Sequence, residues 1–203
     1  MILLPINNVL FPGSKLKLIF TMQEQIKLIK KAYFFNEKVL LLNKRFLFAG
    51  SIGCISEILD AHFFDDIQKC EILFVGLRRA RIKEIKEIAP NENIAIFEDF
   101  VETDSEPSLS LYKELEILLK KLFEETYIQI DPKYFEYLKQ AEYKSYKIAE
   151  KAGLTMEQRQ QLLEIQGENE RLHYLLKHIE TLKASITPEI KARILIMNDG
   201  YLI

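Results

Sequence analysis

Residues 68–88 read QKCEILFVGLRRARIKEIKEI, and the way this stretch folds decides the architecture of the first half of the chain. In its first part, residues 68–75, apolar and polar side chains alternate, which is the two-residue period of a β-strand. The side chains on one face are those of Cys70, Ile72 and Phe74. Gly76 follows directly, and we expect it to close this strand.

The second part of the stretch, residues 78–88, carries isoleucine at every third position, namely 82, 85 and 88. This spacing by itself favours a helix. A strand with a β-bulge produces the same shift of phase, because the bulge inserts one extra residue. We interpret residues 78–88 as a bulged strand.

Short apolar or alternating runs flank this stretch on both sides and predict further strands. These runs cover residues 2–6, 15–20, 39–43, 51–59 and 94–102. In total about seven strands are expected, a number typical of a curled or barrel-like sheet. One short helix interrupts them, and the sequence Thr21-Met22-Gln23-Glu24 fits a capping box at its start.

The second half of the chain has the pattern of helices. Leucines recur at helical spacing from residue 111 onward, and Asp131-Pro132 is typical of a helix start. A second capping box is expected at residues 155–158, with the sequence TMEQ. Together these patterns predict about four helices, which can pack as a small bundle.

The polar stretch TDSEPS, residues 103–108, marks the boundary between the two halves. We therefore expect an α+β fold with a β-rich domain at residues 1–104 and a helical bundle at residues 105–185. The pattern of residues 186–203 fits either a helix or a strand followed by a turn, and both alternatives stay open.

Composition and charge argue against several classes of function. The chain has 203 residues, a formal net charge of −2 and a pI near 6.0, so it lacks the overall positive charge typical of nucleic-acid-binding proteins. It contains only seven glycines and no P-loop motif, which argues against nucleotide hydrolysis. No run of about 18 apolar residues predicts a membrane span, and the start does not resemble a signal peptide, so a cytoplasmic location is expected.

Motifs for catalysis and metal binding are also missing from the sequence. Neither GxSxG nor HExxH occurs, and the three histidines, at positions 62, 173 and 178, are too scattered for a zinc site. Cys54 and Cys70 lack CxxC spacing and are expected to be small core residues. We expect no cofactor, no metal and no enzymatic activity.

The one cluster of basic residues lies in the predicted bulged strand and offers an alternative function. An RNA-binding β-barrel of the PUA type would use Arg78, Arg79 and Arg81 as its contact surface. These arginines are interleaved with aliphatic residues instead of stacking aromatics, and Glu84 and Glu87 reduce the local positive charge. A solvated strand face is the favoured interpretation, and RNA binding is the second hypothesis.

Four short motifs follow one another along the chain in a characteristic order. They are Leu4-Pro5-Ile6 with Leu10-Phe11-Pro12-Gly13 and Leu16-Lys17-Leu18; the glycine-spaced segment 50–55; the segment FVGLRRARI at 74–82; and residues 160–164 with 170–172. In this order they resemble the N-terminal substrate-binding domain of the Lon protease family, over about residues 3–183. The sequence departs from the family pattern at Ala80, where an aromatic residue is usual, and in the segment 20–24.

The resemblance implies a PUA-like β-domain followed by a helical bundle, and a role in recognising or delivering polypeptide substrates. We further expect a stand-alone module without the ATPase and peptidase domains of Lon. On this basis the expected role is that of an adaptor in protein quality control. The expected partners are unfolded polypeptides, and further candidates are a separate protease, a chaperone or a second copy of the chain.

We expect the binding surface to be an apolar cleft in the β-domain or at its junction with the helices, because apolar clefts and sheet edges accept extended chains. The candidate substrate-binding residues are Leu18, Phe20, Phe46 and Phe48. The aromatic residues 33–35 lie near them in the sequence and mark where such a cleft is expected. A deep polar cavity with convergent ionisable groups would instead indicate a small-molecule site or an enzyme.

Overall fold

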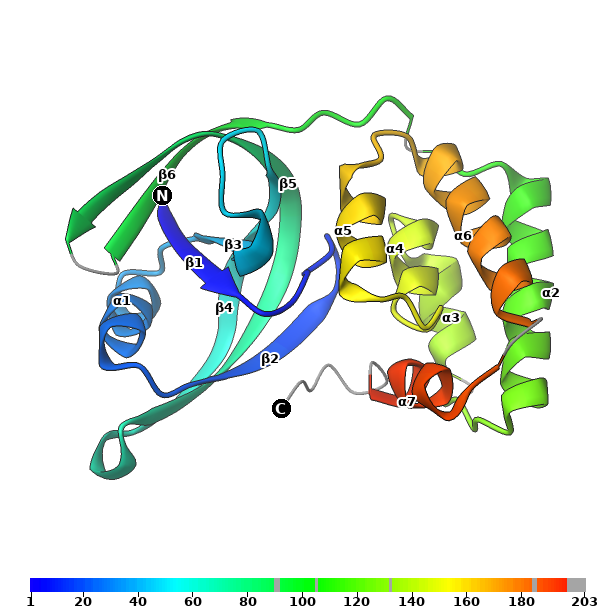
Figure 1. The fold of residues 1–203 in the computed structure, drawn as a ribbon, viewed down its shortest axis with the longest axis horizontal. Coiled ribbons are helices and arrows are strands. Elements are labelled where there is room, and N and C mark those ends of the chain that lie inside the picture. Colours follow the sequence, from blue (N-terminus) through cyan, green and yellow to red (C-terminus); the bar gives the residue numbers. More distant parts are fainter. Residues whose placement is uncertain (90–91, 105, 132, 184–185, 197–203) are drawn as a thin grey trace. The chain divides into compact units, whose positions relative to one another are not determined.

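The computed structural model describes residues 1–89, 92–104, 106–131, 133–183 and 186–196. Within these residues the chain divides into two compact units, Met1–Phe100 and the part from Val101 onward. The first, here called the barrel unit, contains the β-sheet, and the second, the helical unit, contains six helices (Figure 1). The predicted α+β fold is confirmed. No helix in these ranges is long and apolar enough to span a membrane.

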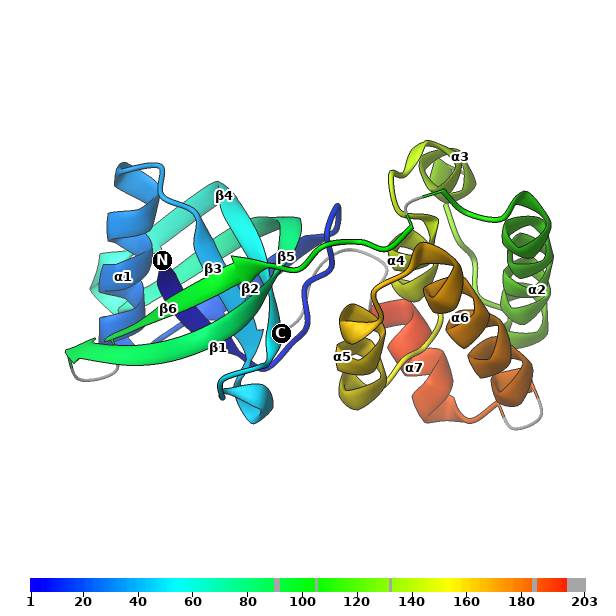
Figure 2. The same ribbon diagram turned by 90° about the horizontal axis from the view of Figure 1, so that it is seen from above.

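The barrel unit is built on one mixed sheet. Its strands are β1 (Ile2–Ile6), β2 (Lys15–Phe20), β3 (Val39–Asn43), β4 (Ile52–Phe64), β5 (Lys69–Ala89) and β6 (Glu92–Asp99). They follow the order β2-β5-β4-β3-β1-β6, and β6 also pairs with β5. Five strands therefore close into a barrel, whereas β2 pairs with β5 alone among the described strands (Figure 2).

β5 is one continuous strand of 21 residues, where the sequence predicted two strands. Its first part pairs with β2 and its second part with β6 along the same edge, while β4 pairs along the opposite edge. Register shifts between Ile82 and Glu84 and between Glu87 and Ala89 confirm a bulged strand instead of a helix. Among the described residues the sheet has six strands and not about seven, because the two predicted strands are one.

Gly76 lies inside β5 and does not close it. A Cβ atom at this position would lie 2.2 Å from the carbonyl oxygen of Phe11. The backbone N–H of Gly76 donates to the carbonyl oxygen of Ser14, and its own carbonyl oxygen accepts from the N–H of Gly13. Glycine is therefore needed for the close approach of the turn at residues 11–14, and the prediction that it ends the strand is wrong.

α1 (Gln23–Phe34) is the helix that interrupts the strands, and it lies at one end of the barrel (Figure 2). The capping box predicted at Thr21 is wrong, because Met22 occupies the N-cap position and no side chain caps the helix. Ile26, Leu28, Ile29 and Ala32 are buried and join the core formed by the strands.

The helical unit contains α2 (Leu109–Thr126), α3 (Lys133–Gln140), α4 (Lys144–Ala149), α5 (Met156–Glu164), α6 (Glu168–Lys183) and α7 (Pro188–Ile196). More helices form than predicted, partly because the region after Asp131 splits in two, with Tyr143 extended at the N-cap of α4. The capping box of α5 is confirmed. The N–H of Gln158 donates to Oγ1 of Thr155, and the N–H of Thr155 donates to Oε1 of Gln158.

The C-terminal segment is helical as far as Ile196, which decides between the two alternatives left open by the sequence up to this residue. At its start, Oγ1 of Thr187 accepts a hydrogen bond from the N–H of Ile190 at 3.4 Å. Ile190 and Ile194 are buried and lie beside Gly153. Residues 197–203 lie outside the described residues.

A buried polar network joins α4, α6 and the start of the helical unit. The guanidinium of Arg171 is 2.8 Å from carboxylate oxygens of both Glu168 and Glu102. Oγ of Ser145 accepts from Nε of Arg171 at 2.9 Å and donates to Glu168 at 2.6 Å. The guanidinium also lies 4.5 Å from the ring centroid of Tyr146. Because these groups satisfy one another, the network stabilises the fold of this unit.

Candidate functional site

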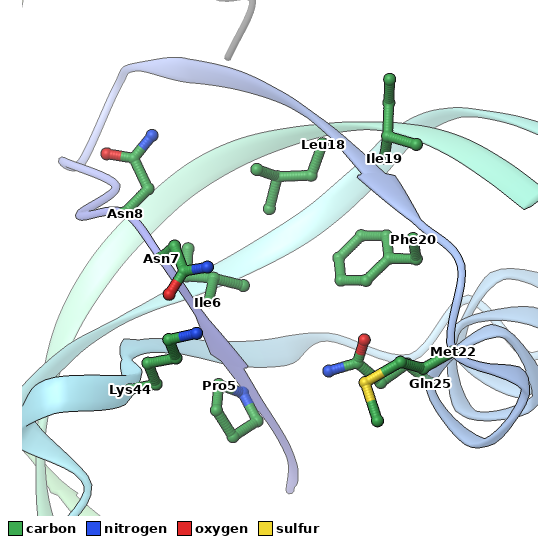
Figure 3. Close-up of a pocket in the computed structure, with 10 residues that line it drawn as sticks. All are labelled: Pro5, Ile6, Asn7, Asn8, Leu18, Ile19, Phe20, Met22, Gln25 and Lys44. Carbon is green, nitrogen blue, oxygen red and sulfur yellow. The ribbon is translucent and has the colours of Figure 1, made fainter. Parts of the chain in front are cut away.

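A cleft in the barrel unit lies between the end of β1 and β2 (Figure 3). Its volume is about 410 Å³, which is within the range of ligand-binding pockets. It is lined by Pro5, Ile6, Asn7, Asn8, Leu18, Ile19, Phe20, Met22, Gln25 and Lys44. We call it the β1–β2 cleft.

The strand pairing explains why this cleft is open. In the described part of the chain β1 pairs with β6 only at Ile2 and Leu3, and no described strand continues along this edge as far as Ile6. β2 pairs with β5 on one side, and no described strand pairs with its other side. The two strands therefore enclose a space that the sheet itself does not fill.

The walls of the cleft are mainly apolar. Phe20 is buried and packs edge-on against Phe74 of the core, with ring centroids 6.3 Å apart. Ile6 and Phe20 point into the cleft (Figure 3). Met22 is 50% exposed, so an apolar ligand in the cleft would remove part of its side chain from water, whereas Ile19 points away from Ile6 and Phe20 (Figure 3).

Three polar side chains, those of Asn7, Asn8 and Lys44, lie at the end of the cleft away from α1 (Figure 3). Asn8 is buried, and its Oδ1 accepts a hydrogen bond from the N–H of Val9 at 2.7 Å. This bond fixes the amide orientation and leaves Nδ2 as a donor, which bonds to no described residue. Lys44 is exposed, and it is the one charged side chain among the described residues that line the cleft.

The structure brings two of the four predicted substrate-binding residues together. Leu18 and Phe20 both line the cleft, as their position on alternate residues of one strand predicts. Phe46 ends a short 3₁₀ helix (Lys44–Phe46), and Phe48 follows it with 56% of its surface exposed. Neither is among the lining residues, because this helical turn directs Lys44 to the cleft instead.

Sequence reasoning missed the polar end of the cleft. Neither Asn8 nor Lys44 is among the candidate binding residues that the sequence predicts. Both reach the cleft because β1 and β3 are parallel neighbours, with Ile6 beside Asn43 in the register. No local sequence pattern marks this parallel pairing of β1 with β3, so the sequence offers no signal for the polar end of the cleft.

The arginines of the RNA-binding hypothesis lie on β5 and make contacts within the barrel unit. Arg79 is buried, with its guanidinium 4.5 Å from the ring centroid of Phe100. Arg81 lies over the same ring at 5.0 Å, and Arg78 forms an ion pair with Asp99. The expectation of a solvated strand face therefore holds for Arg78 and Arg81, which are exposed, and is wrong for Arg79. Burial and ion pairing reduce the charge available to phosphate.

The cysteines and histidines do not form a reactive or metal-binding cluster within the described ranges. Burial raises the pKa of the Cys54 thiol to about 12 and that of Cys70 to about 11, so both are protonated at neutral pH. Burial also lowers the pKa of His178. No group of three or more metal-ligating side chains occurs among the described residues.

A second apolar surface, here called the aromatic patch, lies at the C-terminal end of α1. Tyr33, Phe34 and Phe63 form a ring cluster with centroid distances of 5.8 to 6.4 Å. Phe34 and Phe35 are 73% and 72% exposed. The β1–β2 cleft adjoins the opposite end of the helix, at Met22 and Gln25, so it does not lie at the aromatic residues where it was expected.

The barrel unit thus combines a small closed sheet with an open, largely apolar cleft. Residues 1–181 match the family described as the ATP-dependent protease La (LON) substrate-binding domain. The chain belongs to this family, which confirms the resemblance found in the sequence.

Solved structures agree on the fold. The chain is similar to a Lon N-terminal domain protein from Xanthomonas campestris, with 21% identity, a TM-score of 0.63, and coverage of 87% of this chain and 96% of that one. It is also similar to the N-terminal domain of the Mycobacterium avium complex Lon protease, with 18% identity, a TM-score of 0.69, and coverage of 88% and 97%. A comparison with curated proteins gave no match.

Proposed function

We propose that this chain binds exposed apolar segments of polypeptides in the β1–β2 cleft. The observation that carries the proposal is a cleft of about 410 Å³ whose walls include Phe20, Leu18 and the exposed Met22. Membership of a substrate-binding domain family supports it, because the substrates of a protease are polypeptides. Leu18 and Phe20 are the proposed wall residues, and Met22 is the proposed rim residue.

The proposed role is binding without chemistry. The buried thiols of Cys54 and Cys70 are protonated, and the cleft presents one lysine and several amides as its polar groups. Such a site can retain an extended chain but offers no activated nucleophile. The chain would then act as an adaptor that presents unfolded proteins to a protease or a chaperone.

Binding of an unfolded protein tests the proposal. The probe is fluorescein-labelled, reduced and carboxymethylated lactalbumin, titrated with the full chain and followed by fluorescence anisotropy. Met22→Glu places a charge on the rim, and because Met22 is half exposed the fold should tolerate it. We expect this variant to weaken binding by about tenfold, the effect of losing roughly 1.4 kcal/mol of apolar contact.

Two further variants make the result specific. Ile88→Glu introduces the same charge at a position on β5 that is 55% exposed and does not line the cleft, so binding should be unchanged. Phe34→Ser removes an exposed ring from the aromatic patch. Loss of binding in Phe34→Ser with normal binding in Met22→Glu would place the site at the aromatic patch and refute the cleft.

A further inference from the structure

The β1–β2 cleft offers backbone groups as well as apolar walls. In an edge strand, alternate N–H and C=O groups point away from the sheet and are available to another strand. The segment Leu18–Phe20 pairs with Cys70–Ile72 of β5 on one side and lines the cleft on the other. It therefore presents the hydrogen-bonding pattern that an extended polypeptide requires.

The strand directions define how such a polypeptide would run. β2 is antiparallel to β5, and following the pairings through β4 and β3 shows that β1 and β2 run in opposite directions. β2 runs toward Met22 and α1, away from the end that holds Asn8 and Lys44 (Figure 3). A segment antiparallel to β2, the more stable arrangement, starts near Met22 and leaves the cleft near Asn8 and Lys44.

The polar groups at this exit suit specific atoms of a bound chain. A buried donor without an acceptor is costly, and a carbonyl oxygen of the bound segment would accept from Nδ2 of Asn8. Lys44 forms no ion pair with any described residue, and no acidic side chain lines the cleft. The charge at the exit is therefore complementary to a carboxylate.

We infer that the cleft accepts an extended apolar segment as an added strand antiparallel to β2, with an acidic residue on the C-terminal side of the apolar part. This inference rests on the proposed function and specifies its ligand. Asn8 binds a backbone carbonyl of the segment, and Lys44 pairs with the acidic side chain. A second copy of the chain fits less well, because its own edge strand reads KLKLIF and has no acidic residue.

The order of residues in a peptide tests the direction. Two peptides of about eight residues, with capped ends, carry the same alternating valine and leucine core and differ only in whether two aspartates follow or precede it. The full chain should bind the peptide with C-terminal aspartates roughly two- to fivefold more tightly, as expected for an exposed ion pair. Lys44→Glu should abolish or reverse this preference, and equal affinity of the native chain for both peptides would overturn the inference.

Backbone methylation tests strand addition itself. Moving a single N-methyl group along the preferred peptide should weaken binding about tenfold or more at alternate core positions, where an N–H bonds to β2, and much less at the others. Equal tolerance at every position would overturn strand addition while leaving the proposed function intact. If neither peptide and no unfolded protein bound, the proposed function and the inferred strand addition would both be refuted. If instead the chain formed a dimer that the peptide dissociated, a second copy of the chain would be the occupant of the cleft, and the inferred ligand would be wrong.

Discussion

A buried polar network in the helical unit and a buried amide in the barrel unit differ in how their hydrogen bonds are satisfied. In the helical unit, Arg171, Glu168 and Ser145 are buried and bond to one another. In the barrel unit, Nδ2 of Asn8 is buried beside an open cleft and bonds to no described residue. A satisfied network stabilises the native fold, whereas an unsatisfied donor beside a cavity lowers stability until a ligand supplies an acceptor.

Buried polar groups that stabilise the fold can therefore be told apart from polar groups that are available to a ligand. Charged residues are plentiful in both units, so their number does not locate a site. What distinguishes the cleft is that its lysine and its buried amide lie beside apolar side chains that are still exposed to water, such as Met22. The comparison therefore favours the barrel unit as the place of binding.

The largest loss of stability is expected from removing Arg171, which tests whether the buried polar network stabilises the helical unit. Arg171→Ala leaves the carboxylate of Glu168 buried without its partner, and we expect the free energy of unfolding of the helical unit to fall by about 3 to 5 kcal/mol. Urea unfolding followed by circular dichroism measures it. The double variant Arg171→Met, Glu168→Leu should recover most of the loss, and a cost below about 1 kcal/mol for Arg171→Ala would contradict a structural role.

Gly76 gives the next largest effect, in the barrel unit. Gly76→Ala places a methyl group against the carbonyl oxygen of Phe11, and we expect a loss of about 1 to 3 kcal/mol. The control is Gly13→Ala, whose Cβ meets no atom within 4 Å but whose φ of +75° is unfavourable for alanine, with an expected loss of about 1 kcal/mol. Chemical unfolding compares the two. A smaller loss for Gly76→Ala than for Gly13→Ala would show that crowding is unimportant.

The capping box of α5 should contribute less. Thr155→Ala removes the acceptor for the N–H of Gln158, and the helical unit should lose about 1 kcal/mol of stability. Thr181→Ala removes a hydroxyl that bonds to the carbonyl oxygen of Lys177 within α6, and it should change stability by less than about 0.5 kcal/mol. Similar thermal shifts in both variants would refute the assignment of the cap.

The smallest effect concerns Glu71, which joins β2 to β5. Lys17 and Lys69 lower the pKa of the Glu71 carboxyl from 4.5 to about 2. Because the pKa is lower in the folded state, the ionised carboxylate stabilises the fold above pH 4.5, and this contribution is lost as the pH falls toward 2. An NMR titration should show the low pKa, and Lys17→Gln should raise it. A pKa near 4.5 for Glu71 in the folded protein would show that Lys17 and Lys69 do not stabilise its carboxylate.

Much of the sheet could be predicted, because the alternation of apolar and polar side chains along a strand is visible in neighbouring residues of the sequence. The strands at residues 2–6, 15–20 and 39–43 agree with β1, β2 and β3. The role of Gly76 could not be predicted, since it depends on the approach of Phe11, which is distant in the sequence. Local pattern therefore identified the strand but misplaced its end.

The candidate site was predictable only in part, for the same reason. Leu18 and Phe20 share a strand, so their alternation brought them to one surface. Asn8 follows β1 and Lys44 begins the 3₁₀ helix after β3, and the parallel pairing of β1 with β3 brings these two segments together. Long-range pairing of this kind leaves no mark on the residues themselves.

The long strand β5 also sets an order of assembly. Its pairing with β4 forms a hairpin in which Phe64 meets Lys69 across a short connection, whereas its pairing with β2 joins Lys15 to Val75 from a distant part of the chain. Closing a long loop is slower, so β2 is expected to join the barrel late in folding. Because β5 is the one described strand that pairs with β2, β2 should also detach first, and its amides should exchange with deuterium faster than those of β4.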